Sequence, residues 1–218
     1  LYQVKMVLVI KSTFTGNYGN YGSGIFDIGG TKTTEIDKLY HSNSAFILTI
    51  GCKFITNHYV DFKIDYGWKI LVSNCFFKAH TLYPGAAVYV GSAQILYAIN
   101  TLLYGSTLSP KSTKDFILIN CGFIHVKVTN QGGAIKATGV EHVEITKCLF
   151  FQRFTSISGT GIGLSEVTDI KVKKSVFKNT VATLVESIGV QAQAYFIVFS
   201  HVTFICPQNV FLQEAKQG

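Results

Sequence analysis

Three aspartates and two aromatic residues form the best candidate for glycoside chemistry in this sequence. Asp27, Asp61 and Asp65 occupy or adjoin outward positions on neighbouring units of an internal repeat, and Tyr66 and Trp68 lie beside them. Enzymes that hydrolyse glycosidic bonds use a pair of carboxyl groups, one as general acid and the other as nucleophile or general base. These aspartates are therefore the catalytic candidates if the chain cleaves a polysaccharide, and solvated surface charges are the alternative.

Four of the five cysteines recur at one position of the repeat, and they are Cys52, Cys75, Cys121 and Cys148. If the units stack as strands, neighbouring members of this column lie about 4.8 Å apart, within the range that a disulfide can bridge. Ser12, Thr101, Ser175 and Val202 occupy the same position. Small size therefore explains the column, and we expect reduced thiols, with stacked disulfides as the alternative.

We expect neither a metal nor a cofactor. The sequence contains no Cys-x-x-Cys pair, which is the usual spacing of zinc ligands. The six histidines are spread along the chain and do not converge on one position of the repeat.

The elements that must position these residues follow from the repeat itself. Eight segments align without gaps and end at a shared anchor position, occupied by Phe14, Phe54, Phe77, Leu103, Phe123, Phe150, Phe177 and Phe204. The intervals between anchors are 40, 23, 26, 20, 27, 27 and 27 residues. Apolar residues recur seven positions before every anchor and, except for Thr49, five positions before it, which is the two-residue period of a strand with one buried face. A polar break that includes Asn74, Asn100 and Asn120 follows, as expected of a tight corner.

This repeat predicts an all-β fold, a single-stranded parallel β-helix of about eight coils that fills residues 1–218 as one domain. A unit of 20–27 residues cannot bury its own apolar face, but stacked units share a continuous core. The longest interval predicts an inserted loop at residues 29–45. The composition is 48% hydrophobic and 14% charged, which excludes intrinsic disorder. Apolar runs such as Met6–Ile10 are too short to span a bilayer, so we expect no transmembrane segment.

The sequence resembles the polymorphic outer-membrane proteins, which belong to the wider pectin-lyase-like β-helix proteins. The resemblance rests on the GGAI motif at Gly132–Ile135 and on the FxxN motifs at Phe14–Asn17 and Phe54–Asn57. It extends roughly from Val7 to Phe204. The resemblance implies a right-handed coil and a role at the cell surface or in adhesion.

The outward positions of the first five repeat units are unusually apolar. Residues six and four positions before the anchors point outward by parity, and nine of these ten are apolar. They are Leu8, Ile10, Leu48, Ile50, Leu71, Tyr97, Ile99, Ile117 and Ile119. We call this set the apolar stripe. A stripe five strands wide exceeds what a monomer leaves exposed to water, so we expect a partner protein, self-assembly or the inserted loop to cover it. We also expect the chain to be a section of a longer chain or assembly.

Three functions remain open at this stage. The preferred interpretation is a non-enzymatic structural or adhesive module, extracellular or on the cell surface, that docks a partner protein through the apolar stripe. The second is a β-helix that binds or cleaves polysaccharides. The third is an intracellular scaffold whose net charge of +7 binds an acidic polymer. The lysines are scattered and only one arginine occurs, so we do not expect binding to nucleic acid.

Overall fold

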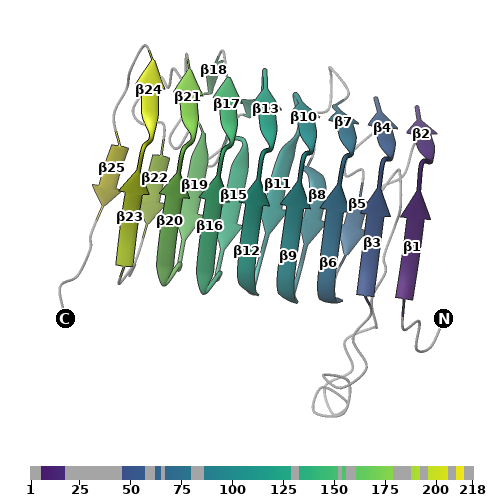
Figure 1. Cartoon of the computed structure of the whole chain (residues 1–218), viewed down its shortest axis with the longest axis horizontal. Helices are drawn as coiled ribbons and strands as arrows, with labels where there is room; N and C mark the ends of the chain where they lie inside the picture. The colour runs from purple at the N-terminus through teal and green to yellow at the C-terminus, as the bar shows by residue number, and fades with distance from the viewer. Residues whose placement is uncertain are drawn as a thin grey trace.

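A computed structural model shows a parallel β-solenoid built from short strands (Figure 1). The structure describes residues 6–17, 46–56, 62–64, 67–79, 86–128, 133–151, 154–155, 161–178, 188–191, 196–205 and 210–213. The predicted all-β class and the parallel β-helix are confirmed. No helix in these ranges is long and apolar enough to cross a membrane.

Two sheets of eight strands run the length of the solenoid, and every ladder in them is parallel. The first sheet has the order β1 (Met6–Ile10), β3 (Phe46–Ile50), β6 (Gly67–Ser73), β9 (Ala93–Ile99), β12 (Thr113–Ile119), β16 (His142–Thr146), β20 (Asp169–Lys173) and β23 (Phe196–Ser200). The second sheet has the order β2 (Thr13–Thr15), β4 (Lys53–Ile55), β7 (Phe76–Lys78), β10 (Leu102–Tyr104), β13 (Gly122–Ile124), β17 (Leu149–Phe151), β21 (Val176–Lys178) and β24 (Thr203–Ile205).

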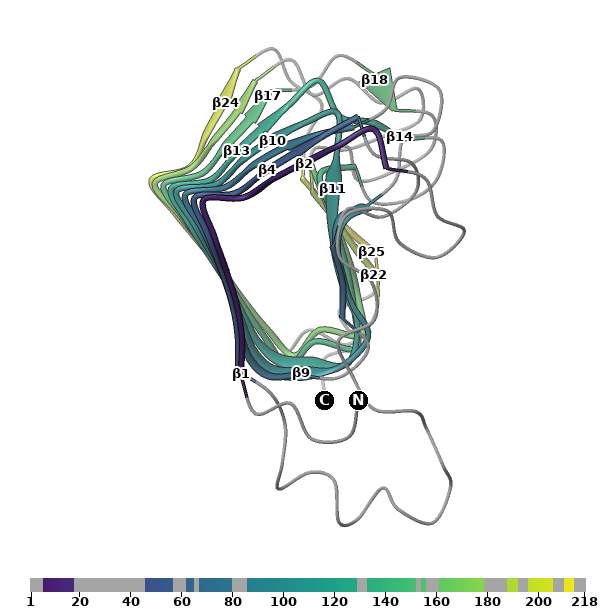
Figure 2. The same ribbon diagram turned by 90° about the vertical axis from the view of Figure 1, so that its right-hand side faces the viewer.

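A third sheet of seven strands closes the solenoid on the remaining side, as the axial view in Figure 2 shows. Its order is β25 (Val210–Gln213), β22 (Ile188–Gln191), β19 (Ile162–Ser165), β15 (Ile135–Thr138), β11 (Thr107–Pro110), β8 (Ala86–Val90) and β5 (Phe62–Ile64). A short pair, β14 (Lys127–Val128) and β18 (Phe154–Thr155), lies outside these three sheets. Because each coil from β3 onward contributes a described strand to each of the three sheets, outward side chains form columns along the solenoid axis.

The anchor residues form a column inside the solenoid, in register on successive strands of the second sheet. The rings of Phe54 and Phe77 stack with centroids 4.7 Å apart, and the centroids of Phe123 and Phe150 lie 4.9 Å apart. The six anchors from Phe54 to Phe177 are fully buried. Phe14 and Phe204, in the first and last strands of this sheet, are half-buried. The column is the continuous hydrophobic core that single units could not form alone.

The corner between the first two sheets consists of one residue in the left-handed backbone conformation. It is occupied by Lys11, Gly51, Asn74, Asn100, Asn120, Lys147, Lys174 and His201, whose φ angles lie between 46° and 65°. Asparagine and glycine tolerate this conformation better than most residues. The side-chain amide of Asn120 also donates a hydrogen bond to Oδ1 of Asn100 at 2.9 Å. These observations confirm the predicted tight corner.

The small residues that follow the corner share a second property besides size. Seven of the eight side chains donate to the carbonyl two residues before them, as Cys75 does to Ser73 and Ser175 does to Lys173, whereas Val202 at the last position has no donor. Several also approach a carbonyl of the neighbouring coil, and Sγ of Cys121 lies 3.2 Å from the oxygen of Ala98. A buried carbonyl without a donor costs free energy. The column therefore favours small residues that carry a donor, namely serine, threonine and cysteine, with Val202 as the exception.

Candidate functional site

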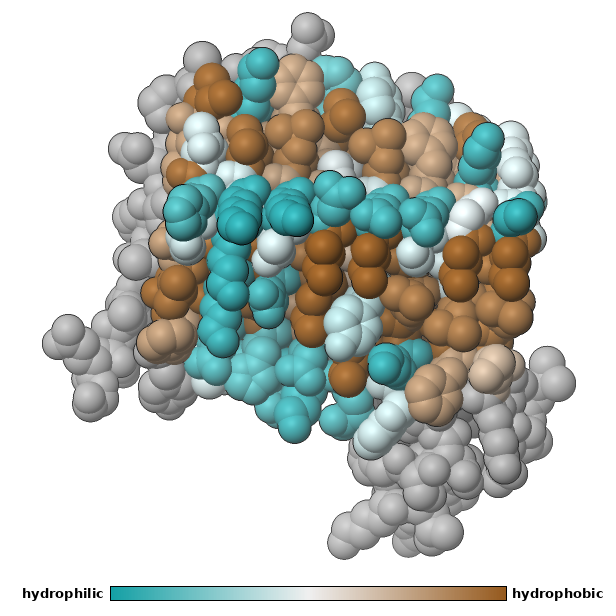
Figure 3. All heavy atoms as spheres, viewed as in Figure 1, coloured by the Kyte–Doolittle hydropathy of each residue, from teal (hydrophilic) through white to brown (hydrophobic). Residues whose placement is uncertain are grey.

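The apolar stripe lies on the outer face of the first sheet, over β1, β3, β6, β9 and β12. Leu8 is 52% exposed and Ile10 is 46% exposed, whereas the members on β3, β6 and β9 are half-buried. Figure 3 shows the corresponding apolar surface over the strands at the N-terminal end of this sheet. Every member of the stripe among the described residues is therefore at least partly exposed.

The apolar surface is wider than the sequence interpretation predicts. Met6 and Phe46 precede stripe members by two residues in the same strands, and both are exposed. Trp68, a neighbour of the candidate aspartates in sequence, is also exposed at the start of β6. Met6 and Phe46 lie eight positions before their anchors, so the same two-residue period places their side chains on the outer face with the stripe. One cation borders the surface, since Nζ of Lys69 lies 5.7 Å from the centroid of the Tyr97 ring.

A cluster of charged residues interrupts this face at β12, β16 and β20, and the sequence interpretation missed it. Asp115, His142 and Asp169 are in register on these three strands, each 27 residues from the next. Nδ1 of His142 lies 2.8 Å from Oδ2 of Asp169, the distance of a short hydrogen bond. The interval of 27 residues, already visible in the anchors, is the signal that could have identified the cluster.

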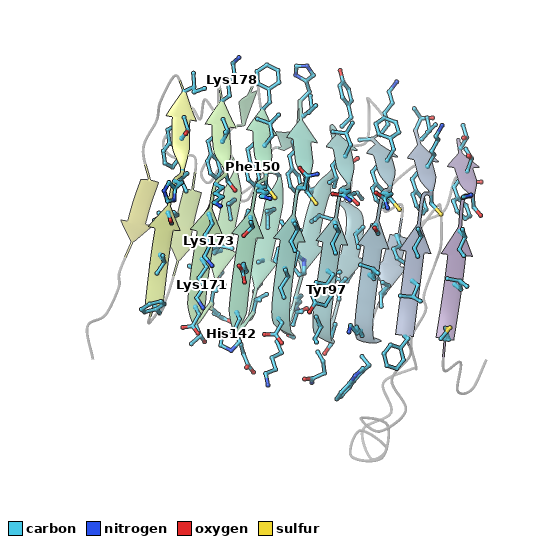
Figure 4. The ribbon with its side chains drawn as sticks, in the orientation of Figure 1. Tyr97, His142, Phe150, Lys171, Lys173 and Lys178 are labelled. Carbon is cyan, nitrogen blue, oxygen red and sulfur yellow. The ribbon has the colours of Figure 1, made fainter. Side chains whose placement is uncertain are left out.

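A shallow cavity of about 210 Å³ lies at this cluster. Asp115, Ile117, His142, Val143, Glu144, Asp169 and Lys171 line it. Beside it, Nζ of Lys173 lies 3.4 Å from Oε1 of Glu144. Figure 4 shows His142, Lys171 and Lys173 on this part of the sheet. The cavity thus combines carboxylates, an imidazole and an ammonium group, which can hydrogen-bond to a hydroxylated or charged ligand.

Two of the predicted features lie outside the described residues. These are the three candidate aspartates, Asp27, Asp61 and Asp65, together with the inserted loop at residues 29–45. Within the described residues, no group of three or more histidine, cysteine, aspartate or glutamate side chains could hold a metal ion.

The four stacked cysteines are free thiols inside the core. Cys52 and Cys75 lie on neighbouring coils, and so do Cys121 and Cys148. Burial raises the pKa of Cys75 to about 11. The hydrogen bond with Cys121 raises the pKa of Cys148, and burial raises it further. Because the thiolate is the nucleophilic form of cysteine, Cys75 and Cys148 are poorly suited to nucleophilic catalysis.

Comparison with models of known protein families finds no match, and neither a curated protein nor a solved structure is found to be similar to this chain.

Proposed function

We propose that this chain is a non-enzymatic structural or adhesive module that docks a partner protein through the apolar stripe. The single observation that carries the proposal is the exposure of large apolar side chains side by side on one flat sheet face. Met6, Leu8 and Ile10 are 58%, 52% and 46% exposed. Singly scattered apolar residues are ordinary on a protein surface, but a contiguous patch of this kind marks an interaction site.

The dimensions of the stripe fit a protein partner better than a small ligand. Five strands at about 4.8 Å spacing and five residues at about 3.3 Å rise cover roughly 400 Å². A standard protein interface buries about 800 Å² on each partner, with an apolar centre and a polar rim. The stripe has the size of such a centre.

The proposed location is the cell surface or the extracellular space. It is supported by the parallel β-helix fold together with the GGAI and FxxN motifs that resemble polymorphic outer-membrane proteins. In this interpretation the chain is a pectin-lyase-like β-helix with an adhesive role. Parallel backbone ladders join the five strands that carry the stripe, and this order before docking lowers the conformational entropy lost on binding.

Photo-crosslinking from the stripe tests this proposal. A photoreactive amino acid at position 8 is expected to capture one partner protein that the same group at Thr203, on the second sheet, does not capture. The purified partner is then tested for binding. Leu8→Lys and Ile10→Lys together should weaken binding at least tenfold, since each places an ammonium group in an apolar contact.

The matched control is Thr13→Lys with Thr203→Lys, which adds the same charge on exposed positions of the second sheet. Equal affinity of the stripe variant and this control would contradict the proposal. Capture of a second copy of the chain, confirmed by sedimentation, would identify the partner as the protein itself.

A second candidate function, cleavage of a polysaccharide, is favoured by the charged cluster. Asp115 and Asp169 are two strands apart, about 9.6 Å along the sheet. Inverting glycosidases place their two carboxyl groups about 6.5–9.5 Å apart, with room for a water between them. His142 lies on the strand between these two aspartates, in register with both, and it is paired with Asp169. These groups could supply a general acid and a general base.

A reducing-end assay on a panel of polysaccharides tests this second candidate. Asp115→Asn and Asp169→Asn should each abolish product, whereas Glu166→Gln, an exposed acid outside the cavity, should leave it unchanged. Turnover that survives both aspartate substitutions would exclude this cluster as the site.

A further inference from the structure

The outer face of the second sheet differs in chemistry from the first. Its exposed charged side chains in the described residues are Lys53, Lys78 and Lys178, and none of its described residues is acidic. The five described acids lie elsewhere: Asp115, Glu141, Glu144, Glu166 and Asp169 belong to the first sheet or to loops that adjoin it. The corner that borders this face adds Lys11, Lys147 and Lys174, all exposed. The charged side chains described on this face are therefore all basic, and they lie among exposed apolar residues such as Leu102 and Leu149.

A row of rings lies on this basic face between two lysines. In one outward column of the second sheet, Tyr104 is in register with Lys78 on one side, and Phe151 is in register with Lys178. His125 lies between the two rings, 5.3 Å from the Tyr104 ring and 5.4 Å from the Phe151 ring. We call Lys78, Tyr104, His125, Phe151 and Lys178 the basic aromatic row. Its members lie in, or directly after, five successive strands of the second sheet, from β7 to β21. Figure 4 shows Lys178 on the last of these strands.

The row combines two kinds of contact at a regular spacing. Tyr104 is 40% exposed, Phe151 is half-buried, and Nζ of Lys178 lies 5.8 Å from the centroid of the Phe151 ring. Strands lie about 4.8 Å apart, so the two lysines are about 19 Å apart with the rings between them. A linear ligand that runs along the solenoid axis would meet a cation, then a series of rings, and then a second cation.

We propose that the basic aromatic row binds a linear acidic polysaccharide whose sugars carry carboxylate or sulfate groups. Sugar rings present apolar C–H faces that pack on aromatic side chains, and their anionic groups pair with lysine ammonium groups. The absence of described acids on this face removes the repulsion that such a chain would otherwise meet. This surface is separate from the apolar stripe, so the inference does not depend on the protein-docking function.

A nucleic acid is the competing polyanion, and the composition argues against it. Proteins that bind phosphate backbones rely on arginine, whose planar guanidinium pairs with phosphate through two hydrogen bonds. The chain has one arginine in 218 residues. The rings of the row are also packed against one another, with Tyr104 and His125 at an interplanar angle of 78°. An edge-to-face cluster leaves little space for bases to enter between the rings, as they do on single-strand binding surfaces.

Binding to heparin and to polygalacturonate, compared with neutral dextran and single-stranded poly(U), tests the inference. We expect the chain to bind at least one of the acidic polysaccharides, with affinity that falls as salt is raised, and not to bind dextran. The two acidic probes separate recognition of sulfate from recognition of carboxylate. Lys78→Ala with Lys178→Ala, and separately Tyr104→Ala with Phe151→Ala, should each weaken binding about tenfold.

The matched control is Lys114→Ala with Lys136→Ala, which removes the same charge from exposed positions on the first and third sheets, outside the cavity at the charged cluster. This control should keep wild-type affinity. Equal losses in the control and in the Lys78 and Lys178 variant would overturn the proposal, because binding would then reflect net charge alone. Tighter binding to poly(U) than to either polysaccharide, or no binding to both acidic polysaccharides, would overturn it as well.

Discussion

The phenyl ring of Phe150 lies on the ring of Phe177 with centroids 4.5 Å apart and an interplanar angle of 3°. The two residues are 27 positions apart in the sequence and in register on β17 and β21. Their contact is repeated between most neighbouring anchors. The rings are therefore both the centre of each coil and the contact between successive coils.

Truncation of this ring should destabilise the solenoid strongly. Phe150→Ala is expected to lower the free energy of unfolding by about 3–5 kcal/mol, because it removes a fully buried ring and leaves a cavity. Chemical denaturation followed by circular dichroism would measure the loss. Phe151→Ala is the control, since its half-exposed side chain points outward at the next position. A similar loss for both variants would contradict a special role for the inward column.

The corner residue should be sensitive to branching at Cβ. Asn120→Val is expected to destabilise the chain by about 1–2 kcal/mol, because Asn120 has a φ of 53° that disfavours residues with a branched side chain. Asn120→Gly should cost less, since glycine accepts this conformation and only the hydrogen bond to Asn100 is lost. Thermal unfolding of the two variants gives the comparison. If valine were tolerated as well as glycine, the left-handed corner would not be a structural requirement.

The small column should accept serine in place of cysteine more readily than alanine. Cys121→Ser keeps a donor for the carbonyls of Ala98 and Ile119, and Ser175 at the equivalent position on a later coil donates to the carbonyl of Lys173, two residues before it. Cys121→Ala removes that donor, and we expect it to cost about 1–2 kcal/mol more than the serine variant. The midpoints of urea unfolding would show the difference. The opposite order would mean that volume alone governs this column.

Alkaline pH should weaken the folded chain through Cys75. Its pKa is raised from the ordinary value of 9.0 to about 11 by burial. Below pH 9 the thiol is protonated in both the folded and the unfolded chain. Between pH 9 and about pH 11 the unfolded chain releases this proton while the folded chain retains it, so stability falls as pH rises.

Comparison of the wild-type chain with Cys75→Ser isolates this contribution from those of tyrosine and lysine. The free energy of unfolding should fall more steeply above pH 9 in the wild type than in the serine variant. Parallel curves would show that the ionisation of Cys75 does not contribute.

Much of the architecture is predictable because the repeat has a fixed period. The anchors, the apolar positions before them and the corner asparagines all recur at the same offset, so the buried face and the turn follow from the alignment. The charged cluster lies eight positions before its anchors, one residue outside the aligned segments from which the apolar stripe is predicted. Extending the alignment by that residue places Asp115, His142 and Asp169 in one outward column.

Other features depend on contacts that the pattern does not contain. The donor role of the column at Cys121 requires a neighbouring carbonyl, whose direction is set by the backbone of the corner rather than by residue type. The basic aromatic row combines Tyr104 and Phe151 at one offset with His125 at the next. Only the spatial arrangement shows that these side chains meet.

The left-handed corner has a consequence for the way in which the two faces could work together. A single residue turns the chain from the first sheet to the second in every coil, so the angle between the faces does not depend on how many coils are stacked. A protein held on one side and a glycan held on the other would not compete for space. Duplication of a coil would then lengthen the solenoid without changing the angle between its protein-binding face and its glycan-binding face.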